Sequence, residues 1–194
     1  RTKSKAEKWI KQYKGKIAET PEEAAKDADF IFTCVGNDDD LKEVTVGKKG
    51  IFNTIKKGAI YIDNTTASAT IARELYKNAK AKGFGFLDAP VSGGQAGAEK
   101  GALTVMVGGD KKDFDQAKKI IDCYSKKAQL LGPAGSGQLA KMVNQICIAG
   151  LVQGLSEAIN FGINSELKME DVIDVISKGA AQSWQMENRY KTMI

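Results

Sequence analysis

The amino-acid sequence predicts an α/β chain, with a doubly wound and mainly parallel sheet followed by the start of an all-helical domain. Short apolar segments alternate with amphipathic segments along residues 28–131, a pattern typical of strands and helices in such sheets. From about residue 135 the pattern is helical only. We therefore divide the chain into residues 1–134, the sheet domain, and residues 135–194, a long connecting helix and the beginning of a helical domain.

The first half of the chain shows helix and strand signals in turn. Residues 4–14 have apolar side chains at helical spacing, and Thr20 followed by proline and two glutamates is typical of a helix start. Residues 28–35 and 59–62 are short apolar runs, which predict buried parallel strands. We interpret the acidic run at residues 38–40 as a helix start rather than a metal site, because carboxylates favour a helix N-terminus.

The second half continues the alternation. We expect a helix over residues 68–82 that ends at Gly83, and another over residues 110–126. Ligands of open α/β sheets bind beyond the carboxyl ends of the strands. Three strand ends carry candidate groups for a site: residues 34–38, 63–66 and 88–94. Three further strands are predicted, at residues 84–87, 103–107 and 128–131.

A glycine-rich turn opens a long helix at residues 132–144. From Met142 to Ser156 no residue is ionisable and apolar positions run nearly all round, which predicts a buried helix. Lys141 lies at the beginning of this stretch. Burying an ammonium is costly unless the group is compensated or loses its proton, so Lys141 is a candidate acid/base group. Asn144 lies three residues further on, a spacing that puts both side chains on one helix face.

A second glycine-rich segment follows the strand that ends at Asp88. Ser92, Gly93, Gly94 and Gly97 lie in the loop expected there. Glycines let backbone amides come close to a ligand and converge on an anion. The residues alone leave two interpretations open, a cradle for a carboxylate and a flexible hairpin connection.

Together, residues 88–101 and 132–144 resemble the beta-hydroxyacid dehydrogenase family, which includes 3-hydroxyisobutyrate dehydrogenases and tartronate semialdehyde reductases. The second segment is similar to the family's Gly-x-x-Gly-x-Gly-x-x-x-Lys-x-x-Asn signature, and the resemblance runs along all 194 residues. It implies an N-terminally truncated Rossmann-type domain that binds a dinucleotide, since the family's Gly-x-Gly-x-x-Gly turn would precede Arg1. We expect an internal piece of a longer protein, inactive by itself.

The resemblance also implies a reaction and the residues that carry it out. The enzyme would transfer hydride between a nicotinamide cofactor and a small beta-hydroxy acid or its semialdehyde. Lys141 would be the catalytic acid/base, and Asn144 would orient the lysine and the substrate oxygen. Ser92, Gly93 and Gly94 would bind the substrate carboxylate.

The cofactor is expected to be NADP in preference to NAD. Arg1 resembles the arginine of an element that follows the second strand in the family, where its planar fork of donors fits a phosphate. An acidic residue at that strand end would instead favour NAD. The residues expected to contact the cofactor are Arg1, Thr2, Val35, Gly36, Asn37 and Thr66.

Composition narrows the classes of function. The chain has no histidine, so histidine triads and histidine metal sites are excluded within it, and the proposed chemistry needs no metal. The net charge of +5 comes from scattered lysines without interleaved aromatic residues, which argues against a nucleic-acid partner. No apolar run reaches the ~18 residues of a membrane span. Three cysteines without a pairing motif predict reduced, partly buried thiols in a cytoplasmic protein. A homo-oligomer, dimer or tetramer, is also expected.

Three alternative functions fit the sequence less well. A 6-phosphogluconate dehydrogenase is a relative with a similar glycine loop, but it usually carries His-Asn where this chain has Val143 and Asn144. Imine reductases share the fold but usually replace the lysine. A non-catalytic scaffold or binding protein that kept the fold would typically lose it too, whereas this chain keeps Lys141.

Overall fold

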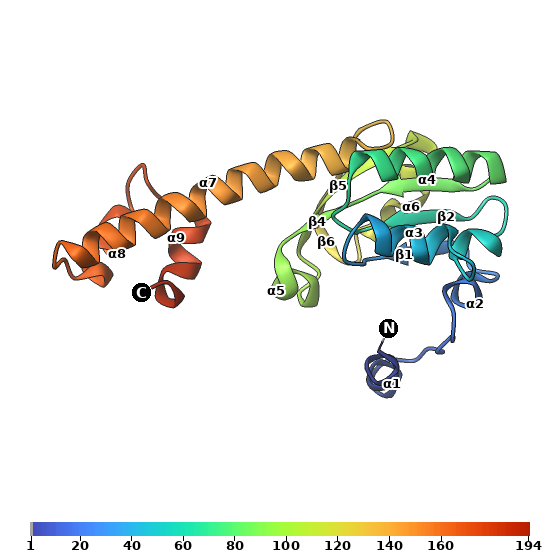
Figure 1. The fold of residues 1–194 in the computed structure, drawn as a ribbon, viewed down its shortest axis with the longest axis horizontal. Coiled ribbons are helices and arrows are strands. Elements are labelled where there is room, and N and C mark those ends of the chain that lie inside the picture. Colours follow the sequence, from blue (N-terminus) through green and yellow to red (C-terminus); the bar gives the residue numbers. More distant parts are fainter. Residues whose placement is uncertain (1) are drawn as a thin grey trace. The chain divides into compact units, whose positions relative to one another are not determined.

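The computed structural model describes residues 2–194 (Figure 1). Backbone contacts divide the chain into two compact units, Arg1–Lys141 and Met142–Ile194, and each is described by itself. Arg1, which the sequence assigned to the cofactor, lies outside the described residues. The boundary expected at residue 134 stays a prediction.

The parallel half of the sheet consists of β1 (Phe30–Thr33), β2 (Ile60–Asp63) and β3 (Gly85–Asp88). These strands are short and apolar, and they pair parallel to one another in the order of the sequence. Thr33 is opposite Asp63, and Asp63 is opposite Asp88. Three strands therefore end side by side, with polar residues at one edge of the sheet.

The other half of the sheet is mixed. β5 (Leu103–Gly109) runs antiparallel to β3 and to the two-residue strand β4 (Val91–Ser92), and parallel to β6 (Ser125–Gly132). The α/β sheet expected from the sequence is confirmed, and this antiparallel pairing is its departure from a parallel arrangement.

Helices cover both faces of the sheet (Figure 1). Successive side chains of a strand point to opposite faces, so Tyr61 and Phe86 pack with the core of α3 (Asp38–Val46) and α4 (Ala69–Lys82). Ile62 and Leu87 instead pack with α6 (Lys111–Ile121). The sheet is thus the middle layer of three, as doubly wound folds require.

Helix starts agree with the capping signals in the sequence. Thr20 accepts a hydrogen bond from the Glu23 N–H at the start of α2 (Pro21–Ala25), at 3.2 Å. Asn37 does the same for Asp40 at the start of α3, which confirms the acidic run as a helix start. α4 ends at Gly83 with a φ of 85°, a left-handed conformation that favours glycine. The first helix, α1, covers Lys3–Gln12.

Several boundaries were predicted wrongly. α6 ends at Ile121 rather than residue 126, because β6 begins at Ser125 and continues the ladder with β5. The expected loop after Asp88 contains a short helix, α5 (Gly94–Glu99), whose alanine, glutamine and glutamate residues favour helix despite two glycines. A 3₁₀ turn at Ile51–Asn53 was not foreseen.

The second unit contains most of α7 (Ser136–Asn164), which begins in the first unit, together with α8 (Met169–Ile176), α9 (Trp184–Arg189) and a 3₁₀ turn at Tyr190–Thr192. Its core is small and apolar, formed where α7 packs against α8 and α9. The buried members are Leu155, Ile159, Met169, Ile173 and Met186.

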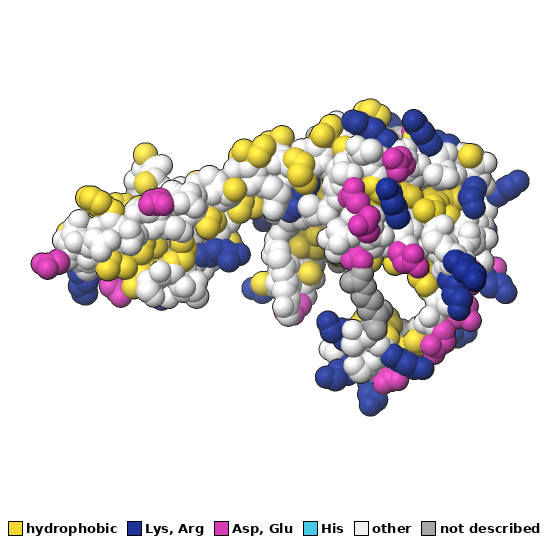
Figure 2. Space-filling model, in the orientation of Figure 1, with side chains coloured by type: hydrophobic (Ala, Val, Ile, Leu, Met, Phe, Trp, Pro, Cys, Tyr) yellow, Lys and Arg dark blue, Asp and Glu magenta, His cyan; other side chains and the backbone are white. Residues whose placement is uncertain are grey.

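The prediction that α7 is buried along its apolar stretch is wrong for this chain. Val143 and Ile146 are 63% and 73% exposed, and Figure 2 shows hydrophobic side chains on the helix surface. The lack of charge shows that the helix has no polar face, but burial also requires a neighbour to pack against. α7 is long and apolar enough to cross a bilayer. This is weak evidence for a membrane span, because core helices of soluble proteins share those properties.

The cysteines also differ from expectation. Cys34, Cys123 and Cys147 are free, and all three are exposed rather than partly buried. Each lies at the end of an element or on the uncovered side of one: after β1, after α6 and on α7. The predicted partial burial of these thiols is therefore wrong.

Candidate functional site

The candidate site is built at the carboxyl edge of β1, β2 and β3, where the glycine-rich start of α7 meets the strand ends. Lys141 lies on α7 with 7% of its surface exposed, so its predicted burial is confirmed. Its ammonium donates a hydrogen bond of 2.8 Å to the carbonyl oxygen of Val91. This contact brings the lysine to the segment that continues into Ser92, Gly93 and Gly94.

Burial lowers the pKa of Lys141 below its ordinary value of 10.5, because an ammonium loses solvation when it leaves water. The carbonyl of Val91 is a neutral acceptor, and Lys141 forms no ion pair within residues 2–194. A lysine with a depressed pKa and no carboxylate partner can both accept and donate a proton near neutral pH more readily than an exposed one.

The Ser92–Gly94 segment connects β4 to α5. Ser92 belongs to β4 and pairs with Thr104 of β5, which fixes its backbone. Gly93 and Gly94 have φ angles of 138° and 62°, values that a residue with a side chain rarely adopts. Both glycines are exposed, so the backbone at this turn faces solvent and can be approached by a ligand.

The start of α7 is held by a carboxylate from the sheet. Asp88, at the end of β3, accepts hydrogen bonds from the N–H groups of Gly135 and Gln138, at 2.7 and 3.0 Å. These N–H groups belong to the first turn of a helix and have no partner inside it. Asp88 therefore caps α7 from another element, a role that the sequence analysis did not assign to it.

Two glycines let α7 approach the sheet this closely. A Cβ atom on Gly108 would lie 2.6 Å from an Asp88 oxygen and 2.7 Å from the Gly137 nitrogen. A Cβ atom on Gly137 would lie 2.5 Å from the Asp88 carbonyl oxygen. Gly108 of β5 and Gly137 of α7 thus allow the helix to pack closely on the strands.

The loops predicted to contact the cofactor are tied to each other. The Val35 N–H donates to the hydroxyl of Thr65 at 3.0 Å. Ser68 donates to Asp38 through its backbone N–H, at 2.8 Å, and through its hydroxyl, at 2.5 Å. The loop after β1 and the loop after β2 therefore form one surface.

Two of the predicted cofactor residues in these loops already have partners. Val35 uses its N–H for Thr65, and Asn37 uses its side chain to cap α3. Gly36 and Thr66 are exposed, whereas Thr65 is buried. The Thr65 hydroxyl is engaged by the Val35 N–H, whereas the Thr66 side chain is exposed; a contact between Thr66 and the cofactor stays a prediction.

Two other predicted residues contact their own neighbours in the chain. Thr2 is exposed and precedes α1, where its carbonyl accepts from the Lys5 N–H at 3.0 Å. Asn144 belongs to the second unit, and its side-chain amide donates to the side chain of Gln145 at 3.0 Å. The roles expected of both stay predictions.

A buried acidic group lies under the loops. Asp63 accepts from the Thr33 hydroxyl at 2.9 Å and from the Thr65 N–H at 3.0 Å, through one oxygen. Its other oxygen is buried without a hydrogen-bond partner within the described part of the chain. Burial raises the pKa of Asp63 to about 6, Asp88 adds to the increase, and the hydrogen bonds from Thr65 and Thr33 oppose it.

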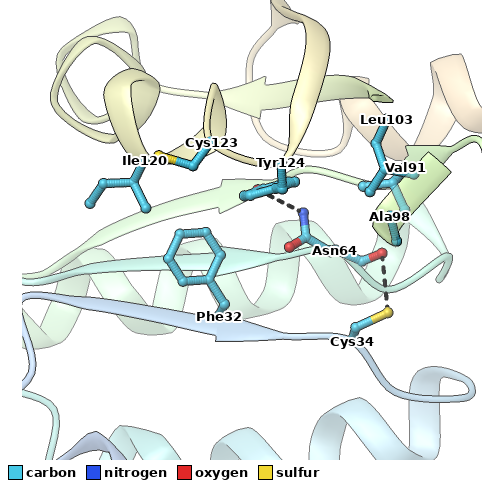
Figure 3. A pocket seen from close by; sticks show the side chains of 9 residues that line it. All are labelled: Phe32, Cys34, Asn64, Val91, Ala98, Leu103, Ile120, Cys123 and Tyr124. Carbon is cyan, nitrogen blue, oxygen red and sulfur yellow. Dashed lines mark hydrogen bonds between the residues drawn. The ribbon is translucent and has the colours of Figure 1, made fainter. Parts of the chain in front are cut away.

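A separate apolar pocket of about 540 Å³ lies beside this edge (Figure 3). Asn64 is its main polar side chain, and its amide donates to the Ala89 carbonyl at 2.7 Å and to the Tyr124 hydroxyl at 3.3 Å. Phe32 meets Tyr124 edge to face, with ring centroids 5.9 Å apart. Since its polar groups bind one another, this pocket offers no obvious partner for a substrate carboxylate. The remaining lining residues are Cys34, Val91, Ala98, Leu103, Ile120 and Cys123.

Within residues 2–194, no group of three or more histidine, cysteine or acidic side chains is placed to hold a metal ion. The sequence analysis named Asp63 and Asp88 among the groups at strand ends without giving either a role, and it missed Gln138. Both aspartates directly end short apolar strands, and Gln138 is a polar residue at the apolar start of a helix. These positions were the signals in the sequence from which a role for the three residues could have been predicted.

Two protein-family models match this chain. Residues 1–132 match the family described as the NAD binding domain of 6-phosphogluconate dehydrogenase, and residues 135–194 match the NAD-binding domain of NADP-dependent 3-hydroxyisobutyrate dehydrogenase. The two matches together cover nearly the whole chain. They bear out the resemblance on which the site prediction was based.

Individual proteins are also similar to this chain. An uncharacterized oxidoreductase of Shewanella frigidimarina is 61% identical over 193 residues, covering all of this chain and 66% of that protein. A probable mitochondrial 3-hydroxyisobutyrate dehydrogenase of Dictyostelium discoideum is 36% identical, over 92% of this chain and 56% of its own length. The chain therefore spans about two thirds or less of the length of these relatives.

Solved structures share the fold. The 3-hydroxyisobutyrate dehydrogenase of Mycobacterium tuberculosis, solved with L-serine, has a TM-score of 0.79 at 29% identity, over 88% of this chain and 58% of that one. A structure named Psf3, in complex with NADP+ and 2-OPP, reaches a TM-score of 0.90 at 22% identity, a likeness of fold alone. The chain belongs to the 3-hydroxyisobutyrate dehydrogenase family, the beta-hydroxyacid dehydrogenases, whose members are NAD(P)-dependent oxidoreductases.

Proposed function

We propose that the full-length protein containing this chain is an NAD(P)-dependent oxidoreductase of a small beta-hydroxy acid or its semialdehyde. The observation that carries the proposal is the buried Lys141, whose ammonium binds the Val91 carbonyl beside the exposed Gly93 and Gly94. A proton-transferring group is thereby placed next to a turn whose backbone can bind an anion.

The edge of the sheet fits a nicotinamide cofactor. Gly36 and Thr66 are exposed at the carboxyl ends of neighbouring parallel strands, where open α/β sheets bind dinucleotides. When bound there, the cofactor supplies the hydride chemistry. The loops after β1 and β2 would hold it, with Thr66 as the side chain open to a contact.

Residues of the chain would transfer the proton and bind the substrate. Lys141 accepts the proton of the substrate hydroxyl in oxidation, and in reduction the protonated lysine donates it to the carbonyl oxygen. Ser92, Gly93 and Gly94 bind the carboxylate and so fix the reacting carbon relative to the lysine. Asn144 is proposed to orient the substrate oxygen.

The test is to replace Lys141 in the full-length protein. Candidate substrates are 3-hydroxyisobutyrate, tartronate semialdehyde, glyoxylate and succinic semialdehyde. Lys141→Ala should lower kcat about 10²–10⁴-fold, the usual contribution of a general acid/base, and leave cofactor affinity within a few-fold. The exposed Lys127 provides a matched control, since Lys127→Ala should keep wild-type turnover. More than about a tenth of wild-type activity in Lys141→Ala would contradict the role.

NADP is the proposed cofactor, with NAD second. The support is the match of residues 135–194 to an NADP-dependent family and the arginine fork of Arg1, which fits a phosphate. The ratio of kcat/KM for NADP to that for NAD should fall in Arg1→Ala of the full-length protein. A wild-type preference for NAD, or an unchanged ratio in the variant, would contradict this assignment.

We also propose a cytoplasmic homo-oligomer, dimer or tetramer, that binds neither nucleic acid nor membrane. Composition supports the compartment and the expected absence of nucleic-acid and membrane partners: scattered lysines, unpaired cysteines and polar interruptions in the long helix. The exposed apolar side chains of α7, such as Val143 and Ile146, support the oligomer. Size-exclusion chromatography with light scattering on the full-length protein tests the oligomeric state.

A further inference from the structure

Gln138 is a buried polar residue to which the proposed reaction assigns no task. Its side chain is 0% exposed and lies on the first turn of α7, three residues before Lys141. The amide oxygen accepts from the Ala67 N–H at 3.0 Å, and the amide nitrogen donates to the Thr65 carbonyl at 2.7 Å. One side chain thus joins α7 to the loop after β2, about seventy residues earlier in the chain.

An amide is the side chain that this position requires. Thr65 and Ala67 are buried, so their carbonyl and N–H groups have no access to water. A buried backbone group that loses its hydrogen-bond partner destabilises a protein, because it cannot bind water instead. An apolar residue would leave both groups unpaired, and an ionised glutamate has no N–H for the carbonyl.

The same loop is the one proposed to hold the nicotinamide. Thr66 lies between the two groups that Gln138 binds, and Thr65 accepts from the Val35 N–H of the neighbouring cofactor loop. The backbone N–H of Gln138 is in turn fixed by Asp88. Gln138 is therefore bound on one side to the end of β3 and on the other to the cofactor loops.

Lys141 shares a helix face with Gln138. Residues three apart on a helix are neighbours, so a displacement of the first turn of α7 carries the lysine with it. We propose that Gln138 is a positioning residue that sets the distance between Lys141 and the loop that holds the nicotinamide. This inference rests on the proposed function, because it assigns to Gln138 the geometry of that same reaction. A misplacement of about 1 Å can lower a rate by about 10²-fold.

The experiment is a double-mutant cycle in the full-length protein. Gln138→Met keeps the length of the side chain and removes both hydrogen bonds. We expect kcat to fall about 10–100-fold while the KM for cofactor changes less than about threefold. In a Lys141→Ala background the same substitution should change kcat by less than about threefold, because there is no lysine left to misplace.

Two further variants complete the test. Gln153→Met, on an exposed position of the same helix, should leave kcat unchanged in both backgrounds. Gln138→Glu keeps the volume and the acceptor for Ala67; it serves as the second variant if Gln138→Met does not fold, as judged by circular dichroism and thermal unfolding. We expect the same loss of kcat and the same dependence on Lys141.

The outcomes separate the two proposals. An equal loss of kcat in both backgrounds, or a loss confined to cofactor KM, would overturn the positioning role while leaving the proposed function intact. An inactive wild type over all substrates, or a fully active Lys141→Ala variant, would overturn the proposed function and the inference with it.

Discussion

The buried carboxyl of Asp63 makes the stability of the first unit depend on pH in a direction that can be worked out. Its pKa of about 6 lies roughly two units above the ordinary value of 3.8, chiefly because of burial. Each unit corresponds to about 1.4 kcal/mol, so keeping Asp63 ionised in the folded state costs about 3 kcal/mol at neutral pH.

The sign follows from proton binding. Between pH 4 and 6 the folded state holds more protons at Asp63 than the unfolded state. The stability that the protonated Asp63 contributes is therefore fully present below the unfolded pKa, and it is lost as the pH rises through the folded pKa. From pH 4.5 to pH 7.5, Asp63 should lower the free energy of unfolding by about 2 kcal/mol.

Asp63→Asn removes this dependence. The asparagine carbonyl can still accept from Thr33 and Thr65, the two donors that meet one carboxylate oxygen in the structure. Urea unfolding of the full-length protein at pH 4.5 and 7.5 measures the effect. The free energy of the variant relative to wild type should shift by about 2 kcal/mol in favour of the variant at the higher pH.

Buried acids that do not interact with Asp63, such as Asp113, whose pKa burial also raises, titrate in both proteins and cancel in this difference. Glu7→Gln, at an exposed position on α1, is the matched control and should follow the wild-type curve. Parallel curves for wild type and Asp63→Asn would refute the reasoning, since they would mean that Asp63 ionises at the same pH in the folded and unfolded chain.

Two more predictions follow from the start of α7. Gly108→Ala places a Cβ atom against Asp88 and Gly137, so it should destabilise the protein by about 1–3 kcal/mol in urea unfolding; a change under about 0.5 kcal/mol would show that the contact is not tight. The second concerns the pH profile of reduction, where kcat/KM should fall as Lys141 loses its proton, at a pH below 10.5 because burial lowers its pKa. Persistence of that limb in Lys141→Ala would assign it to another group.

The sequence predicted the alternation of strands and helices because capping residues and short apolar runs are local signals. Thr20, Asn37 and Ser68 all cap the helices that follow them. The buried Lys141 was predicted for a similar reason, because its position in an apolar helix start can be read directly.

What could not be predicted depends on contacts distant in sequence. The role of Gln138 becomes visible only once Thr65 and Ala67 are known to lie beside it. Likewise, the end of α6 is set by the pairing of β6 with β5, although helical spacing continues past Ile121. Val143 was expected to be buried because its helix is apolar, but it is exposed. An apolar pattern shows that a helix can pack against a neighbour, and it does not show that the neighbour is present.

The pairing of Lys141 with a backbone carbonyl, rather than a carboxylate, has a consequence for ligand binding. A carboxylate ligand would supply the only full negative charge next to the ammonium within the described chain, and so would raise the pKa of Lys141 on binding. Binding should then draw a proton from the buffer whenever the free lysine is partly neutral. Calorimetric binding enthalpies would consequently vary with the ionisation enthalpy of the buffer, and affinity for the anion would weaken as salt screens the attraction.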